Sequence, residues 1–172
     1  ANIIANQEIQ IGEDKIDVSQ ITGELLASLN ELAGSEANVA TGYHAIEFLL
    51  WGQDLNGTNP GAGQRPVSDF IDGEGCTGGN CERRAQYLKV ATDLLVSDLE
   101  EMVGHWKEGG QARKAVQHDA QAGLAAMLKG LGSLSYGELA GERMKLGLML
   151  HDPEEEHDCF SDNTHNSHYY DQ

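Results

Sequence analysis

Apolar residues recur every three or four positions from residue 22 onward, which is the spacing of one face of an α-helix. Thr22 is a suitable N-cap for the first helical segment, and Gly34 closes it. Ser35 is in turn a favourable N-cap for a second helix, which we expect over residues 36–52.

The longest helix is expected over residues 80–108, because one apolar stripe runs through Leu88, Ala91, Leu95, Leu99, Met102 and Trp106. Another helix is expected over 111–130. A last one is expected from Ser135 to about His151, since the position before Pro153 disfavours helical backbone.

Two stretches lack this periodicity. Residues 1–21 hold β-branched residues interrupted by Gly12 and are expected to form an extended arm with a strand-like piece. Residues 53–80 are rich in Gly and Pro and are expected to form a long loop, whose length is typical of a functional, packed or mobile segment. Because almost nothing after residue 22 indicates a strand, the predicted fold class is all-α, a helical bundle in one domain over residues 1–172.

Composition narrows the classes of function. The 172 residues match the length of one domain. Asp and Glu number 28 against 11 Lys and Arg, a net charge of −17. A nucleic-acid partner is therefore not expected, because its groove needs a basic stripe, and an anionic membrane surface is disfavoured. Acidic chains suit cationic partners, metal ions among them.

Neither a membrane span nor a leader is expected. The chain has no run of about 18 apolar residues. Its first residues lack the basic start of a secretory leader, and they lack an initiator Met, so we expect a mature or trimmed product.

The second predicted helix carries candidate metal ligands. Its apolar residues cover most of the circumference, so we expect it to be buried. Its polar stripe, about 100° wide, contains Glu36, Tyr43, His44 and Glu47. His44 and Glu47 lie three residues apart and are therefore neighbours on the helix.

A buried imidazole and a buried carboxylate each need a polar partner: they can hydrogen-bond to each other, pair with another group, or bind a cation. As metal ligands they would make half of a mixed nitrogen and oxygen site. Arg83, Arg84 or Arg143 could instead pair with Glu47 inside the bundle and compete with a metal. The zinc-protease pattern H-E-x-x-H is absent, and these interpretations stay open on spacing alone.

A resemblance to a known family adds to this picture. The run Gly42-Tyr43-His44-Ala45-Ile46-Glu47 matches the G-x-H-x-x-E motif of imelysin-like proteins. Segments 34–55, 65–70, 83–88, 141–144 and 156–165 resemble the iron-regulated protein A branch of that family. The similarity covers nearly the whole chain, which looks like the central portion of a longer family member.

The resemblance implies a helical protein of the bacterial envelope, periplasmic or associated with the outer membrane, that acts in iron acquisition. It implies one lobe of a two-lobe fold, with the motif in a cleft between lobes. A second lobe or another chain, and envelope iron-transport components, are then expected partners.

The same resemblance implies that His44 and Glu47 bind iron, another metal ion such as zinc, or an iron-carrying ligand. Glu36 and Tyr43 are further candidates. One alternative is a metallopeptidase in which His44 is a metal ligand and Glu47 the general base. The other is a non-catalytic binding module in which the pair is structural.

The three cysteines carry a second expectation. Cys76 and Cys81 flank Thr-Gly-Gly-Asn, and in an oxidising envelope we expect them to form a disulfide that pins the loop beside the next helix. A metal site that includes Cys159 is the rival interpretation, although C-x4-C is not a usual zinc spacing.

The last segment, 151–172, is acidic and rich in histidine. It holds seven acidic residues and four of the seven histidines, with no Lys or Arg. Weak metal binding and a solvated acidic turn both account for this composition. We expect His157, Asp162 or His165 to lie near the cleft.

Overall fold

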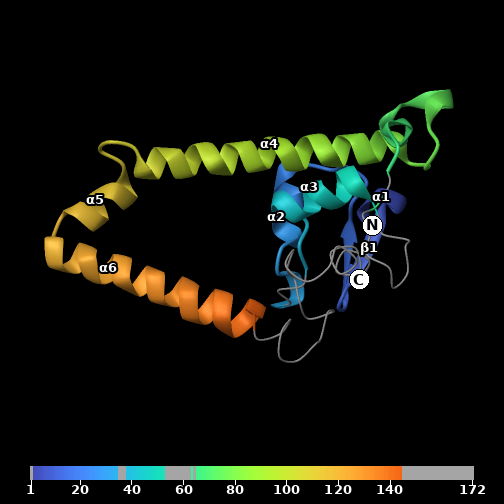
Figure 1. Cartoon of the computed structure of the whole chain (residues 1–172). Coiled ribbons are helices and arrows are strands. Elements are labelled where there is room, and N and C mark those ends of the chain that lie inside the picture. The colour runs from blue at the N-terminus through green and yellow to red at the C-terminus, as the bar shows by residue number, and fades with distance from the viewer. Residues whose placement is uncertain (1, 35–37, 53–62, 64, 145–172) are drawn as a thin grey trace.

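The protein, described here as a computed structural model, is built around one long helix, α4 (Cys81–Trp106) (Figure 1). The structure describes residues 2–34, 38–52, 63 and 65–144. Apart from one two-stranded sheet, its regular elements are helical, which confirms the predicted all-α class. No helix in these ranges is long and apolar enough to cross a membrane.

The predicted extended arm contains a short helix and a hairpin. Helix α1 (Asn2–Ala5) precedes the strands β1 (Glu8–Ile11) and β2 (Asp14–Asp17), which pair antiparallel with Ile9 opposite Ile16. Gly12 lies in the connecting turn with φ 61°, a conformation that glycine adopts at no steric cost. This turn explains why a glycine interrupts the β-branched run.

Helix α2 (Gly23–Leu29) begins as predicted, because the Thr22 hydroxyl accepts a hydrogen bond from the backbone N–H of Leu25 at 3.2 Å. It ends at Leu29, and a short 3₁₀ turn, η1 (Leu32–Gly34), follows.

Helix α3 (Gly42–Trp51) starts six residues later than expected, so the predicted start at residue 36 is wrong. Residues 38–41 are not helical because asparagine side chains hold their backbone in another conformation. Asn30 Oδ1 accepts from the N–H of Ala40 at 2.8 Å, and Asn38 Nδ2 donates to the carbonyl of Leu32 at 2.7 Å.

The described part of the predicted loop contains two 3₁₀ turns, η2 (Val67–Phe70) and η3 (Gly73–Gly75). Helix α4 then agrees with the predicted 80–108 segment to within two residues at each end.

The segment predicted as one helix over 111–130 is two helices, α5 (Gln111–Gln117) and α6 (Ala120–Gly132). The chain breaks there because Asp119 caps α6, accepting from the N–H of Ala122 at 2.7 Å. Helix α6 continues directly into η4 (Ser133–Met144), a π-helical segment, so the expected break before Ser135 is wrong. The rest of the predicted 135–151 helix lies outside the described residues.

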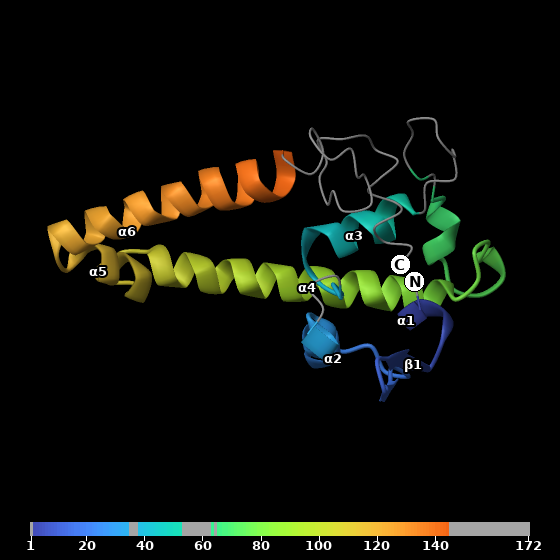
Figure 2. The ribbon, with the colours of Figure 1, turned by 90° about the horizontal axis from the view of Figure 1, so that it is seen from below.

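The core surrounds the first half of α4. Its fully buried side chains come from the hairpin exit, α2, α3 and α4, and the largest are Ile21, Leu26, Leu49 and Val18. Figure 2 shows the hairpin, α2 and α3 around this half, whereas α5 and α6 extend from the other end of α4. The helix of the G-x-H-x-x-E motif therefore lies against the core.

Candidate functional site

The motif helix α3 presents a histidine and a glutamate in contact. His44 Nδ1 lies 3.0 Å from Glu47 Oε2, which is hydrogen-bond distance. The two side chains are 43% and 56% exposed. The pair is thus formed as the spacing predicts, and solvent reaches it.

The expectation that this helix is buried is wrong. Ala45 and Leu49 are its buried residues, whereas Tyr43, Leu50 and Trp51 are exposed. Because α3 packs against α4 along one side, the other side keeps its polar and aromatic groups at the surface.

The backbone conformation at the start of α3 explains the glycine of the motif. Gly42 begins α3 with φ 86°, a value in the region that L side chains rarely adopt. Thr41 precedes it in extended conformation, and its hydroxyl accepts from the Asn30 amide. The helix start, and with it the position of His44 two residues later, is fixed by these contacts.

The remaining predicted ligands fall into two groups. Tyr43 is 63% exposed and lies four residues before Glu47, on the same side of α3. Glu36, His157, Asp162 and His165 lie outside the described residues. Within the described residues, no group of three or more His, Cys, Asp and Glu could hold a metal ion.

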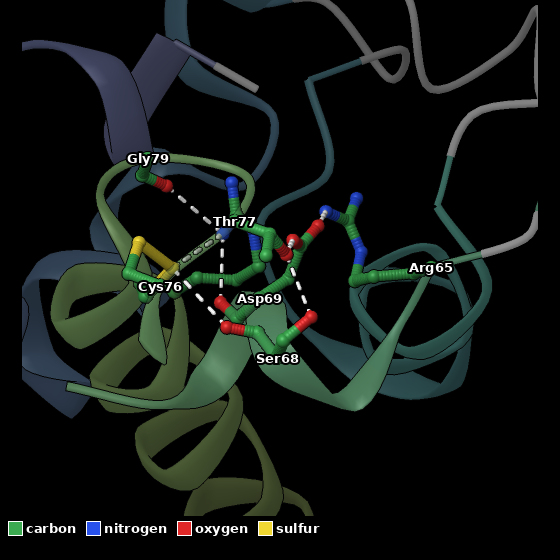
Figure 3. A network of polar contacts seen from close by, with 8 residues as sticks. Arg65, Ser68, Asp69, Cys76, Thr77 and Gly79 are labelled. Atoms are coloured by element: carbon green, nitrogen blue, oxygen red, sulfur yellow. Dashed lines mark hydrogen bonds and ion pairs between the residues drawn. A yellow bond between two sulfur atoms is a disulfide. The ribbon is translucent and has the colours of Figure 1, made fainter. Parts of the chain in front are cut away.

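A polar network runs through the loop after α3, from Arg65 to Gly79 (Figure 3). The backbone N–H of Arg65 donates to the carbonyl of Trp51 at 3.0 Å, and the Arg65 guanidinium lies 5.9 Å from the ring centre of Phe48. Arg65 Nη1 also donates to Asp69 Oδ2 at 3.2 Å. Burial lowers the pKa of Arg65, as does the charge of Arg84, and Asp69 partly compensates.

Asp69 and Arg84 join this network to the start of α4. Thr77 Oγ1 donates to Asp69 Oδ1 at 2.9 Å and lies 2.6 Å from the hydroxyl of Ser68. Arg84 Nη1 donates to the carbonyls of Asp69 and Gly79, at 2.8 and 3.0 Å. The network therefore holds residues 65–80 between the end of α3 and the start of α4.

The predicted disulfide is confirmed. Cys76 and Cys81 are bonded, with 5.8 Å between their Cα atoms. The bond fixes the loop to the first residue of α4, as expected. Since a disulfide offers no thiolate for a metal, the rival site that includes Cys159 is wrong.

Arg83 and Arg84 have partners other than Glu47, the carboxylate considered from sequence, and the side chain of Arg143 lies outside the described part of the chain. Arg83 and Arg84 donate to backbone carbonyls. Sequence reasoning also missed Arg65, Asp69 and Thr77. No spacing marks them, because the contacts join a Gly-rich loop to two helices.

Two comparisons with known proteins bear on this chain. Among curated proteins, none matches it. The sequence model of the imelysin family, peptidase M75, matches residues 4–172. This match includes α3 with its His–Glu pair and nearly all of the chain. The chain therefore belongs to the imelysin family.

Proposed function

We propose that this chain binds iron or another metal cation, free or within an iron-carrying ligand, through His44 and Glu47. We further propose that it serves iron acquisition in the bacterial envelope, as a relative of the iron-regulated protein A branch. One observation carries the metal proposal: an imidazole and a carboxylate in contact on a helix face that solvent reaches.

The separation of the two ligand atoms suits a shared ion. Metal bonds of about 2.1 Å from nitrogen and oxygen, meeting at a right angle as in octahedral coordination, place the two atoms about 3.0 Å apart. His44 Nδ1 and Glu47 Oε2 are separated by 3.0 Å. A cation can therefore take the place of the hydrogen-bonding proton with little movement of either side chain.

Two protein ligands leave most positions of an octahedral ion to other groups. The described residues offer no third His, Cys, Asp or Glu grouped with this pair. Oxygen-rich small molecules that carry ferric iron bring such ligands with them. This is why the proposal includes an iron-carrying ligand as cargo.

The disulfide supports the envelope location. Disulfides persist in oxidising compartments such as the periplasm and are rare in the cytosol. Cys76 is joined to Cys81 here. Fractionation of the source cells would test the location, and a purely cytosolic protein would contradict it.

Titration calorimetry with ferric citrate, ferrous ion and zinc ion tests the site. His44→Ala should weaken binding by at least tenfold, and Glu47→Gln should weaken it similarly. His105→Ala is a matched control, because His105 is also 43% exposed and lies 3.3 Å from Glu101 on α4. The control should bind as the unmodified chain does. Equal binding by the His44→Ala variant and the unmodified chain would refute the proposal.

The same metal-loaded proteins test for peptidase activity against a peptide library. If the unmodified chain cleaved peptides and the Glu47→Gln variant did not, Glu47 would be a general base and the chain an enzyme and not only a binding protein. The proposal expects no cleavage by either protein.

A further inference from the structure

The two sulfurs of the Cys76–Cys81 disulfide lie in different surroundings. Cys76 is partly exposed and belongs to the loop before α4. Cys81 is the first residue of α4 and is only 3% exposed. A thiol that approaches from solvent therefore has better access to the sulfur of Cys76 than to that of Cys81.

Arg84 lies beside the buried sulfur. Its Nη1 is 3.9 Å from Cys81 Sγ and also donates to the carbonyls of Asp69 and Gly79 (Figure 3). The Arg84 residue is 7% exposed, and among the described residues its Nε has no hydrogen-bond partner and no carboxylate forms an ion pair with it. A buried guanidinium without an anionic partner is unfavourable, because its charge is removed from water and is not neutralised.

The carboxylate of Asp69 is engaged by other groups. Its Oδ2 accepts from Arg65 and its Oδ1 accepts from Thr77, so that only its backbone carbonyl contacts Arg84. Burial lowers the pKa of Arg65, and the positive charge of Arg84 lowers it further. Two neighbouring guanidiniums thus share one carboxylate, and a second negative charge beside Arg84 would be stabilised.

The start of α4 also favours a negative charge. The helix has 26 residues, and the side chain of Asn80 before it makes no capping hydrogen bond. The N–H groups of the first turn and the helix dipole therefore stabilise an anion at the first residue. Two groups oppose a thiolate there, namely the carbonyl of Ser68, 3.6 Å from Cys81 Sγ, and the exposed Glu82. Arg84 outweighs them, because the carbonyl has only a partial charge and water screens the carboxylate.

We propose that thiols open this disulfide at Cys76 and that Cys81 leaves as a thiolate paired with Arg84. The attacking thiolate forms a bond to Cys76 Sγ, the bond between the two protein sulfurs breaks, and the electron pair stays on Cys81 Sγ. A second thiol then attacks the sulfur now attached to Cys76 and releases it, so that two thiols are oxidised to one disulfide. Stabilisation of the leaving thiolate accelerates the first step. Cys76 is thus a site of reversible thiol modification, and its opening removes the covalent link between residues 65–80 and α4.

Peptide mass spectrometry of the full chain identifies the sulfur that is attacked. Every protein carries Cys159→Ser, so that only the two disulfide sulfurs react. The folded, oxidised chain is exposed briefly to glutathione, quenched with acid and alkylated with N-ethylmaleimide. Glutathione should appear on Cys76 and the maleimide on Cys81, at least about tenfold more often than the reverse. Equal labelling, an excess of glutathione on Cys81, or opening only in denaturant would overturn the proposal.

The rate of opening by dithiothreitol tests the role of Arg84. Arg84→Gln should slow the reaction by about threefold or more, because the leaving thiolate loses its paired charge, whereas Arg84→Lys should restore most of the rate. Lys89→Gln is the control for a lost positive charge, since Lys89 is 74% exposed on the same helix and should leave the rate unchanged. An equal or faster rate in Arg84→Gln would overturn the assignment.

The ultraviolet absorbance of the thiolate gives a measurement that leaves Arg84 in place. One protein carries Cys76→Ser and Cys159→Ser and keeps Cys81 alone, and its counterpart carries Cys81→Ser and Cys159→Ser and keeps Cys76 alone. At neutral pH the first should show the larger thiolate absorbance, and unfolding in urea should remove the difference. Equal absorbance of the two folded proteins would contradict a stabilised thiolate at Cys81.

Discussion

Arg83 connects the N-terminal arm to α4, and its replacement gives the sharpest stability prediction. Its guanidinium donates five hydrogen bonds, all to backbone carbonyls, namely those of Ile3, Ile4, Asn6, Val18 and Ser19, at 2.7 to 3.2 Å. No side chain of the arm takes part. The arm is therefore attached to α4 by a single charged group that can reach five acceptors at once.

The size of the effect follows from those contacts. Four of the five hydrogen bonds lie in partly buried surroundings, and the one to Asn6 is exposed. A net contribution of about 1 kcal/mol for each partly buried bond gives about 4 kcal/mol for Arg83→Met, which keeps the apolar stem and removes the donors. A loss of that size is a large part of the roughly 5–15 kcal/mol of a typical domain.

Urea denaturation followed by circular dichroism measures the loss, and amide hydrogen exchange shows where it falls. Exchange should accelerate most in β1 and β2. Lys89→Met is the control, because Lys89 lies on the same helix, is 74% exposed and pairs with Asp93 at the surface, where a pair contributes about 1 kcal/mol or less. If Arg83→Met cost no more than Lys89→Met, or if exchange in the hairpin stayed the same, the assigned role of Arg83 would be wrong.

Two further predictions concern groups packed near the core. Burial raises the pKa of Tyr87 to about 12, and its hydroxyl donates to the carbonyl of Ala40 at 2.8 Å. The unfolded chain releases this proton near pH 10, so the contribution of Tyr87 to the free energy of unfolding should be fully present below pH 10 and should fall by about 3 kcal/mol as the pH rises to about 12. Urea denaturation at several alkaline pH values measures this fall, and Tyr87→Phe should lack that part of it. Opening the disulfide, by reduction or by replacing both Cys76 and Cys81 with Ser, should lower the free energy of unfolding by about 2 kcal/mol. Denaturation with and without dithiothreitol checks this, and unchanged stability of the reduced chain would contradict it.

Long periodic segments were predictable from sequence. The wrongly predicted helix ends are places where side chains form hydrogen bonds with nearby backbone groups. The apolar stripe of α4 runs over many turns, so its ends were predicted to within two residues. The start of α3 was missed because Asn30 and Asn38 bind backbone groups that a helix would otherwise use. Asp119 divides the 111–130 segment in the same way, by capping α6.

In the candidate site, too, local contacts were predictable from sequence and tertiary contacts were not. The contact between His44 and Glu47 depends only on their spacing within one helix, and so the sequence predicts it. Their exposure depends on which side of α3 packs against α4, and that is a property of the tertiary structure. The contacts of Arg65 with Asp69 and Phe48 likewise depend on how a loop returns to the end of α3.

The placement of the arginines bears on which cargo the His–Glu pair would accept. Arg84 is buried, Arg65 and Arg83 are partly buried, and their guanidiniums contact Asp69 or carbonyl groups inside the fold. Three of the 11 Lys and Arg residues are thus turned inward, in a chain with 28 Asp and Glu. Carboxylates therefore dominate the charged groups at the surface even more than the composition indicates. Such a surface raises the local concentration of cations, within about 10 Å at 0.1 M salt, and repels anions. A bare ferric ion or a neutral or cationic iron complex should consequently approach His44 more readily than a strongly anionic chelate.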